Sequence, residues 1–452
     1  MKSHRLALLL LGAILVIGVG IMFLWGTQRV KAVYPAPGAT TLPAGVPVRI
    51  TFSRPMQASS VTAHLSTEPT LNGKWTEQAD TLTFTPGQPW PNGITVTVHL
   101  QAGARSTGII GLPMLNGRTW SFTTERPRLA YLWPSSGPSD IYALDPNSGQ
   151  VERLTNTQGV LDFSINPDGL TIYYSLSNAD GSADIYHLDR LTATATLVLE
   201  CAQATCHAPR LSPKGDFLAY ERIPMSQPGQ IAFPQVWLLP LPQGAPVLAG
   251  DSANQTQSPR WSATGQLAYY DKTRQGFVIQ DSHGGKADFF ANQTGEGGDW
   301  SPDGKFFIAP EIFYVPAGSD QPTATSHLIS FNRLDGKTTD LTKDDNLEDT
   351  GPAFSPDGSS LAFARKYLDI TRWTPGRQLW LMKSDGSGAR QLTDNAFDNH
   401  YDFAWSQDSR RLAYVISNQA KPTDPPELWL VNADGSNPVQ LVIGGYAPQW
   451  MP

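Results

Sequence analysis

A short turn signature recurs six times in residues 128–452, and this repeat restricts the fold more than any other feature of the chain. Each copy has Trp, Phe or Leu, then Ser, a Pro-Asp-Gly-like turn and a short apolar run. The turn positions are 46, 50, 39, 54 and 51 residues apart, at Asp168, Lys214, Thr264, Asp303, Asp357 and Asp408. A period of about 40–50 residues is typical of β-propeller blades rather than of a helical solenoid.

The chemistry of the turn predicts a tight hairpin in every copy. In Ser301–Gly304, proline presets φ for the second position of a type I turn, and glycine accepts a positive φ at the fourth. Runs such as Leu361–Phe363 form the return strand. A second signature follows, as in Gln378–Trp380, and then an outer strand such as Gln391–Thr393. Each unit is therefore predicted to contain four antiparallel strands.

The number of units predicts how the ring closes. The second signature occurs seven times, whereas the complete hairpin occurs six times. The first unit, at 129–155, lacks its innermost strand, and Ala447–Trp450 matches the missing one. We therefore expect an all-β fold with a seven-bladed propeller at 128–452, closed by the C-terminal strand, which removes an exposed sheet edge. Six blades are the alternative, because the fifth unit is irregular.

These repeats resemble the propeller of the TolB family, whose units carry the same Ser-Pro-Asp-Gly turn followed by Leu-Ala-Tyr or Leu-Ala-Phe. The resemblance implies a fold and not a function, since the recurring residues are structural. Similar propellers precede a hydrolase domain in prolyl-oligopeptidase-type peptidases. No Gly-x-Ser-x-Gly motif occurs in this sequence, and no other catalytic motif is evident, so the sequence predicts no peptidase activity.

Residues 35–125 have the pattern of a small β-sandwich. Apolar and polar residues alternate in Val48–Phe52 and Ile94–Val98, and proline–glycine turns separate such runs. The segments Phe52–Met56, Leu82–Pro86 and Trp120–Thr124 resemble the bacterial Ig-like domain of S-layer proteins. Members of that family usually act as spacers or adhesion modules on bacterial surfaces. We expect an immunoglobulin-like β-sandwich here.

The N-terminus predicts a membrane segment. Lys2 and Arg5 precede twenty uncharged, mostly apolar residues, Leu6–Trp25, enough to span a bilayer core of about 30 Å. Residues 1–30 are thus expected to form a cytoplasmic tip and one transmembrane helix. A signal peptide cleaved after Val30–Ala32 is the alternative. Both interpretations place the rest of the chain outside the cytoplasm, in the periplasm or at the cell surface.

Charge and cysteine content exclude some functions. The net charge is −7 and no basic run lies beyond the N-terminus, so nucleic-acid binding is not expected. Cys201 and Cys206 lie in one predicted blade-to-blade loop, followed by His207. Outside the cytoplasm this pair is predicted to form a disulfide, with a metal site that includes His207 as the alternative.

Long connections on one face of the propeller are the predicted binding region, because binding usually resides in variable loops on a rigid scaffold. These connections are 221–234, 310–326, 366–377 and 417–426. The alternative is that their aromatic side chains pack the loops onto one another. The predicted binding residues are Phe313, Tyr314, Tyr367 and Trp373, with Ile231 and Phe233 as further aromatic or apolar candidates.

Two acidic connections, 343–349 and 394–402, are predicted to line the channel mouth on the same face. Asp345, Asp398 and His400 are their candidate binding residues. Carboxylates at this density leave calcium binding open, although neither segment has EF-hand spacing, and a solvated acidic rim is the alternative. No cofactor is predicted.

The function expected from these features is that of a membrane-anchored extracytoplasmic binding or scaffold protein. Its propeller loop face would hold a protein or peptide of the cell envelope. The alternatives are a propeller enzyme acting on envelope glycan or peptide, and a structural component of a surface layer.

Overall fold

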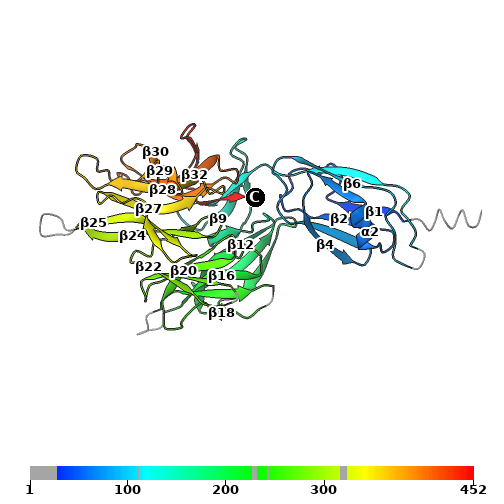
Figure 1. Ribbon diagram of the computed structural model, residues 1–452, viewed down its shortest axis with the longest axis horizontal. Helices are drawn as coiled ribbons and strands as arrows, with labels where there is room; N and C mark the ends of the chain where they lie inside the picture. The colour runs from blue at the N-terminus through cyan, green and yellow to red at the C-terminus, as the bar shows by residue number, and fades with distance from the viewer. Residues whose placement is uncertain (1–27, 109–110, 227–231, 243, 283, 316–322) are drawn as a thin grey trace, which may run out of the picture. The chain divides into compact units, whose positions relative to one another are not determined.

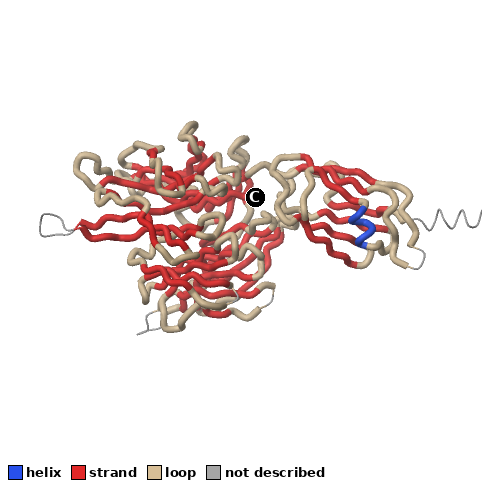
Figure 2. The backbone as a smooth tube through the Cα atoms, in the orientation of Figure 1, coloured by secondary structure: helices blue, strands red, loops and turns tan. Residues whose placement is uncertain are grey.

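The computed structural model describes residues 28–452 except 109–110, 227–231, 243, 283 and 316–322 (Figure 1). The described residues form an all-β protein, in which α2 (Ala58–Ala63) is a helix of six residues (Figure 2). The predicted membrane segment, 6–25, lies outside the described residues. Within the described part, no helix has the length and apolar character needed to cross a membrane. The chain divides into two compact units between Arg126 and Pro127.

The first unit is a sandwich of two antiparallel sheets. One has the order β1-β2-β5-β4, with β1 (Val30–Tyr34), β2 (Val48–Phe52), β5 (Thr81–Pro86) and β4 (Gly73–Gln78). The other has the order β3-β6-β7, with β3 (Leu65–Glu68), β6 (Thr95–Leu100) and β7 (Arg118–Thr123). Trp90 is buried in the core, where its ring lies 6.1 Å from Phe122 and its Nε1 donates to the Val46 carbonyl at 3.0 Å.

The second unit is a propeller whose described strands form three four-stranded and two eight-stranded sheets. Each eight-stranded sheet consists of two antiparallel four-stranded groups joined by one parallel pairing, β13 with β15 or β25 with β27, so we describe the strands as seven groups. Group 1 contains β8 (Arg128–Trp133), β9 (Asp140–Leu144), β10 (Val151–Arg153) and β35 (Tyr446–Met451). Group 2 contains β11 (Val160–Ile165), β12 (Thr171–Ser177), β13 (Ala183–Asp189) and β14 (Thr194–Leu199). Group 3 contains β15 (Ala204–Leu211), β16 (Phe217–Pro224), β17 (Gln235–Pro240) and β18 (Val247–Leu248).

The remaining groups follow in chain order. Group 4 contains β19 (Thr256–Trp261), β20 (Gln266–Asp271), β21 (Gly276–Asp281) and β22 (Asp288–Ala291). Group 5 contains β23 (Asp299–Trp300), β24 (Phe306–Val315), β25 (Thr323–Asn332) and β26 (Thr338–Asp340). Group 6 contains β27 (Leu347–Phe354), β28 (Ser360–Tyr367), β29 (Gln378–Lys383) and β30 (Arg390–Gln391). Group 7 contains β31 (Asp398–Trp405), β32 (Arg411–Asn418), β33 (Glu427–Asn432) and β34 (Val439–Ile443).

The last strand of the chain completes the first group. β35 pairs antiparallel with β8, so that Trp450 lies opposite Leu129 and Tyr446 opposite Leu132. Met451 at its end is buried in the core shared by groups 1 and 2. In Figure 1 the end of the chain is drawn in red at the label C. The pairing ties the two ends of the propeller unit together.

The recurring turn is built as the sequence predicts. Gly304 has a φ of +69° and its N–H donates to the Ser301 carbonyl at 2.8 Å. The Ser301 hydroxyl donates to Asp303 Oδ1 at 2.7 Å and accepts the Phe306 N–H at 2.9 Å. The serine therefore holds both sides of the hairpin, which explains its recurrence without any binding role.

The tryptophan of the signature joins one group to the next. Four indole N–H groups donate to a carbonyl on the innermost strand of the preceding group. These bonds run from Trp261 to Arg210 (2.9 Å), Trp300 to Arg260 (3.2 Å), Trp405 to Ala353 (3.0 Å) and Trp450 to Ala404 (2.9 Å). A partly buried hydrogen bond of this kind contributes about 1 kcal/mol, so the four indoles stabilise the contacts between groups as well as each hairpin.

Candidate functional site

The connections of groups 5, 6 and 7 form one continuous layer, which we call the loop layer. It comprises residues 341–346, 368–377, 392–397 and 419–426. Backbone hydrogen bonds link each segment to the next: Leu368 N to Asn346 O (2.8 Å), Gly376 N to Ala396 O (3.0 Å) and Gln419 N to Phe397 O (2.7 Å). The segments are therefore held by one another as well as by their own strands.

Three large apolar side chains stand exposed on this layer. Ile370 is 96% exposed, Trp373 55% and Phe397 48%. Scattered single apolar residues are ordinary on a protein surface, whereas these three lie on two segments that are hydrogen-bonded to one another. Only Trp373 was among the predicted binding residues. Ile370 was not predicted; its signal in the sequence is an isolated isoleucine between the polar residues Asp369 and Thr371.

Trp373 lies beside a compact polar and aromatic arrangement. Its backbone N–H donates to the Asp369 carbonyl at 2.9 Å. Arg372 lies 3.8 Å above the Tyr367 ring and forms an ion pair with Asp369 at 2.6 Å. The hydrogen bond from Arg372 lowers the pKa of the Asp369 carboxyl to about 2. These contacts fix the segment that carries Ile370 and Trp373.

The placement of Tyr367 on an exposed loop is wrong. Tyr367 is the last residue of β28 and is half-buried, with its ring 6.1 Å from Trp380 in an edge-to-face contact. Arg372 covers its other side. Tyr367 thus packs against the segment 368–377, in line with the alternative that aromatic side chains pack the loops onto one another. Trp373, in contrast, remains exposed.

Phe313 and Tyr314 also lie on a strand and not on a loop. β24 continues to Val315 because Ile312–Val315 is a run of β-branched and aromatic residues with a strong strand preference. Tyr314 is 65% exposed. Phe313 is 38% exposed, lies 4.9 Å from His327, and lines a groove of about 730 Å³ between groups 4 and 5. Of the two other candidates, Phe233 is half-buried and Ile231 lies outside the described residues.

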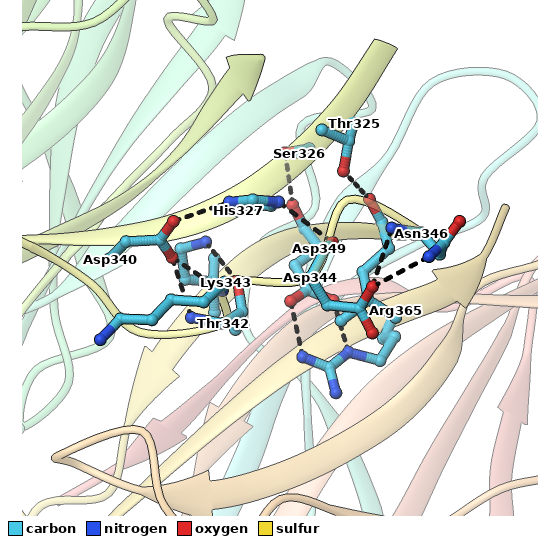
Figure 3. A network of polar contacts seen from close by, with 12 residues as sticks. Thr325, Ser326, His327, Asp340, Thr342, Lys343, Asp344, Asn346, Asp349 and Arg365 are labelled. Carbon is cyan, nitrogen blue, oxygen red and sulfur yellow. Dashed lines mark hydrogen bonds and ion pairs between the residues drawn. The ribbon is translucent and has the colours of Figure 1, made fainter. Parts of the chain in front are cut away.

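A buried polar network supports the connection 341–346 (Figure 3). Arg365 reaches Asp349 with two hydrogen bonds, of 2.7 and 2.8 Å, and Asp349 has no exposed surface. The Ser326 hydroxyl donates to the Asp349 carbonyl at 2.8 Å. His327 lies between Asp340, at 2.7 Å, and the Asp344 carbonyl, at 3.1 Å. The network joins β25, β27 and β28 beneath the loop layer.

The acidic connection uses its carboxylates to hold its own backbone. Asp344 Oδ1 accepts the Asn346 N–H at 2.9 Å, and Asp340 Oδ1 accepts the Lys343 N–H at 3.0 Å. Asp345 is exposed. Across the residues that the structure describes, no group of three or more His, Cys, Asp or Glu side chains is placed to hold a metal ion. The geometry therefore offers calcium no cluster at Asp345.

His400 is a core residue and not part of an exposed rim, which corrects that prediction. It is 2% exposed on β31, with its ring 5.5 Å from Tyr414. Its Nδ1 lies 2.8 Å from the Arg377 carbonyl, which fixes the proton on that nitrogen in the neutral ring. Burial lowers the pKa of His400 to about 4. Asp398, at the start of the same strand, is half-buried, and burial raises its pKa.

His400 is expected to make the stability of the propeller depend on pH. Its pKa is depressed on folding, from about 6.5 to about 4, so its stabilising contribution is complete above pH 6.5 and is lost as the pH falls through 4. The loss amounts to about 3 kcal/mol. Thermal unfolding measured between pH 7.5 and 4 should show a steeper decline for wild type than for His400→Gln. Parallel curves would contradict this role for His400.

Carboxylates along the inner strands brace one group against the next. Asp162 accepts the Ala208 N–H at 2.7 Å, and Asp299 accepts the Phe354 N–H at 2.8 Å. Glu221 accepts the Ser258 N–H at 2.8 Å in the same way. Bulges in the inner strands, where Ala208 and Ser258 have positive φ, turn these N–H groups toward the neighbouring group. The first role of these carboxylates is therefore structural.

A cavity of about 400 Å³ lies among the inner strands of groups 4 to 7. Arg260, Asp299, His400 and Asp402 are among its lining residues. Burial raises the pKa of Asp299 and of Asp402, and both carboxylates interact with Arg260. Titratable groups from groups 4, 5 and 7 therefore meet in this cavity.

Cys201 and Cys206 are joined by a disulfide with an S–S distance of 2.00 Å. Both residues are buried, and the Cys201 N–H donates to Asp184 Oδ1 at 2.7 Å. His207 lies 3.7 Å from both Asp162 and Glu221, in an ion-pair arrangement away from the two sulfurs. A stable disulfide is typical of a protein outside the cytoplasm.

Residues 27–124 match the family described as the bacterial Ig-like domain. The uncharacterized protein Atu1656 of Agrobacterium fabrum is 29% identical over 168 residues, which cover 34% of this chain and 50% of that protein. The chain spans half or less of the length of the curated relatives that it matches first.

Solved structures resemble the chain in fold. A prolyl endopeptidase is 11% identical with a TM-score of 0.50, covering 69% of this chain and 48% of the other. TolB from Acinetobacter baumannii is 14% identical with a TM-score of 0.44, covering 94% of this chain and 99% of the other. At such identities the likeness concerns the fold alone. Residues 27–124 thus match the bacterial Ig-like domain, and the rest of the chain shares its fold with the solved prolyl endopeptidase.

Proposed function

We propose that this chain is an extracytoplasmic binding protein whose loop layer holds a protein or peptide of the cell envelope. The observation that carries the proposal is the exposure of Ile370, Trp373 and Phe397 on segments that are hydrogen-bonded to one another. Aromatic anchors on a rigid surface bind with little loss of conformational entropy, which is why such residues dominate protein interfaces.

The remaining features fit this proposal. We interpret the seven strand groups as seven blades of a ring closed by β35. The disulfide and the bacterial Ig-like domain support a location outside the cytoplasm. The apolar segment 6–25 would anchor the chain in the membrane, and the Ig-like domain would act as a spacer between that anchor and the propeller.

An enzyme acting on envelope glycan or peptide is the second candidate. The observation that favours it is the cavity lined by Arg260, Asp299 and Asp402, since raised carboxyl pKa values often mark catalytic sites. The hydrogen bond that Asp299 accepts from the Phe354 N–H weakens this argument, because it gives one of the two carboxylates a structural role.

The test is an affinity purification of the full chain from cross-linked intact cells. The variant Ile370→Ser/Trp373→Ser/Phe397→Ser removes the apolar side chains of the loop layer. Its matched control, Leu334→Ser/Val247→Ser/Val439→Ser, removes three side chains of similar exposure (68%, 57% and 50%) elsewhere on the propeller. We expect wild type and control to capture the same envelope protein, and the loop-layer variant to lose at least about nine-tenths of it, as for two or three interface anchors.

Two other outcomes would count against the proposal. Equal capture by all three proteins would show that the loop layer is not the interface. Loss in the control as well as in the loop-layer variant would show a general effect of surface polarity. In either case the cavity at Arg260 becomes the site to test with glycan and peptide substrates.

A further inference from the structure

A pocket of about 540 Å³ opens between groups 5 and 6, on the side of the recurring turns. Its lining includes the turn residues Ser301–Asp303 and Asp357–Gly358, and Ser384–Asp385 from the turn after β29. None of the loop-layer segments that carry Ile370, Trp373 or Phe397 contributes to it. Its volume lies within the range of about 300–1,000 Å³ found for small-molecule sites.

The floor of the pocket is apolar. Ile308 and Phe354 are 1% and 9% exposed, and Leu341 and Pro302 are half-buried beside them. Phe306 is 37% exposed, although it stands at the start of β24 among these buried side chains. A ligand with an aromatic or branched body would cover this ring and gain the free energy of burying it.

The rim of the pocket is acidic. Asp303, Asp357 and Asp385 all line it, and no lysine or arginine is among the described lining residues. Hydrogen bonds from Ser301 and Lys305 lower the pKa of Asp303 to about 2. Bonds from Ser355 and Ser387 lower the pKa of Asp357 and of Asp385, respectively. The three carboxyl groups are therefore ionised at neutral pH.

Other crevices on the turn side are crossed by an arginine. Arg333 of group 5 approaches Asp281 and Asp288 of group 4, at 4.0 Å each. Arg390 of group 6 donates to the Asp434 carbonyl of group 7 at 3.2 Å. Arg411 of group 7 donates to Asn147 Oδ1 of group 1 at 3.2 Å. A guanidinium group thus fills the space between neighbouring groups at each of these crevices.

Phe306 occupies the position that Arg411 has in its own hairpin. Each residue follows the turn and donates its backbone N–H to the hydroxyl of the signature serine, at 2.9 Å in both cases. In group 7 the side chain at this position is the cation that crosses to the next group. In group 5 it is an aromatic ring, so the crevice keeps an apolar floor and an acidic rim. No cation is among its described lining residues, although Lys305 of the turn forms an ion pair with Asp303 at 2.9 Å.

We propose that this crevice binds a small organic cation, composed of an aromatic ring and a protonated amine. The ring lies against Phe306 and the apolar floor, and the ammonium group takes the place that the arginine holds between other groups. Leu341 is the one loop-layer residue in the described lining, and Ile370, Trp373 and Phe397 are not part of it, so the proposal stands independently of the partner-binding function.

The test is a calorimetric titration of the full chain with three probes of similar size that carry the same phenyl ring. These are 2-phenylethylammonium, 2-phenylethanol and 3-phenylpropionate. Each partly exposed charge pair contributes up to about fivefold in affinity, so the ammonium probe should bind about tenfold or more tightly than the alcohol. The carboxylate probe should show no saturable binding. Raising the salt concentration should weaken the binding of the ammonium probe and leave the affinity for the alcohol unchanged.

Matched variants locate the site. Thr339 lines the crevice, whereas its neighbour Thr338 lines the groove on the other side of β26, so Thr339→Trp should abolish binding and Thr338→Trp should not. Asp385 and Asp434 each accept the N–H of a serine two residues on, at 2.9 Å. Asp385→Asn should lower the affinity for the ammonium probe about threefold to fivefold, and Asp434→Asn should have no effect on it.

Equal affinity for the ammonium and alcohol probes would overturn the proposal, and so would equal effects of the two variants in each matched pair. The absence of saturation by about 10 mM probe would also overturn it, because a pocket with this apolar floor should bind the probe more tightly than that. A thermal unfolding curve for every variant confirms that it is folded, so that loss of binding is not loss of structure.

Discussion

Deletion of residues 446–452 is expected to lower the unfolding temperature of the propeller by about 10 °C or more. The deletion removes β35, exposes the edge of β8 and empties the site of Met451, which is 1% exposed. It also removes the hydrogen bond from Trp450 to the Ala404 carbonyl. A buried methionine and a partly buried hydrogen bond together stabilise by about 3–6 kcal/mol, to which the lost strand pairing adds.

Differential scanning calorimetry of the full chain and the deletion variant measures this effect. The control is Val439→Ser/Ile443→Ser, which changes two exposed residues of the outer strand β34, next in sequence to β35. We expect the control to unfold within about 2 °C of wild type. A deletion variant that unfolds as the control does would show that β35 does not close the propeller.

Removal of Arg365 is expected to destabilise the propeller by about 3–5 kcal/mol. Asp349 has no exposed surface, and Arg365 is the cation that donates two hydrogen bonds to its carboxylate in Figure 3, beside a further contact from Thr342. Arg365→Met therefore leaves a buried carboxylate without its cation, which costs far more than the pair contributes. The double variant Asp349→Leu/Arg365→Met should recover at least about 2 kcal/mol of the loss, because no charge is then buried.

The matched control is Arg372→Met, which breaks the exposed ion pair with Asp369. We expect this change to lower the free energy of unfolding by less than about 1 kcal/mol, as for other exposed ion pairs. Chemical denaturation of the four proteins gives the comparison. Equal losses for Arg365→Met and Arg372→Met would contradict the assigned importance of the buried pair, as would a double variant less stable than Arg365→Met.

The fold could be predicted in detail because its signals are local. A Ser-Pro-Asp-Gly turn fixes a hairpin through contacts within six residues, as Ser301 and Phe306 show. Because the turn recurs along the chain, the same hairpin is predicted for each of its copies. The link from Trp405 to the Ala353 carbonyl is the same kind of feature, but it joins residues 52 apart, so its purpose emerges only from the structure.

The candidate site was less predictable, because exposure depends on what covers a residue. Tyr367 and Trp373 have the same aromatic character in the sequence, yet Arg372 and Trp380 cover one ring and leave the other exposed. His400 stands in an acidic segment, but its strand turns the ring into the core. The strand preference of Ile312–Val315 was a readable signal, and it was outweighed by the expectation of a long loop.

The central claim is that the loop layer is a binding surface, and site-specific photo-cross-linking tests it most directly. A photoreactive phenylalanine analogue is placed at position 373 and, as control, at position 334 on the turn after β25, in intact cells. The account predicts one discrete cross-linked envelope protein at position 373 and none at position 334. The same pattern at both positions, or no cross-link at 373, 370 and 397, would contradict it.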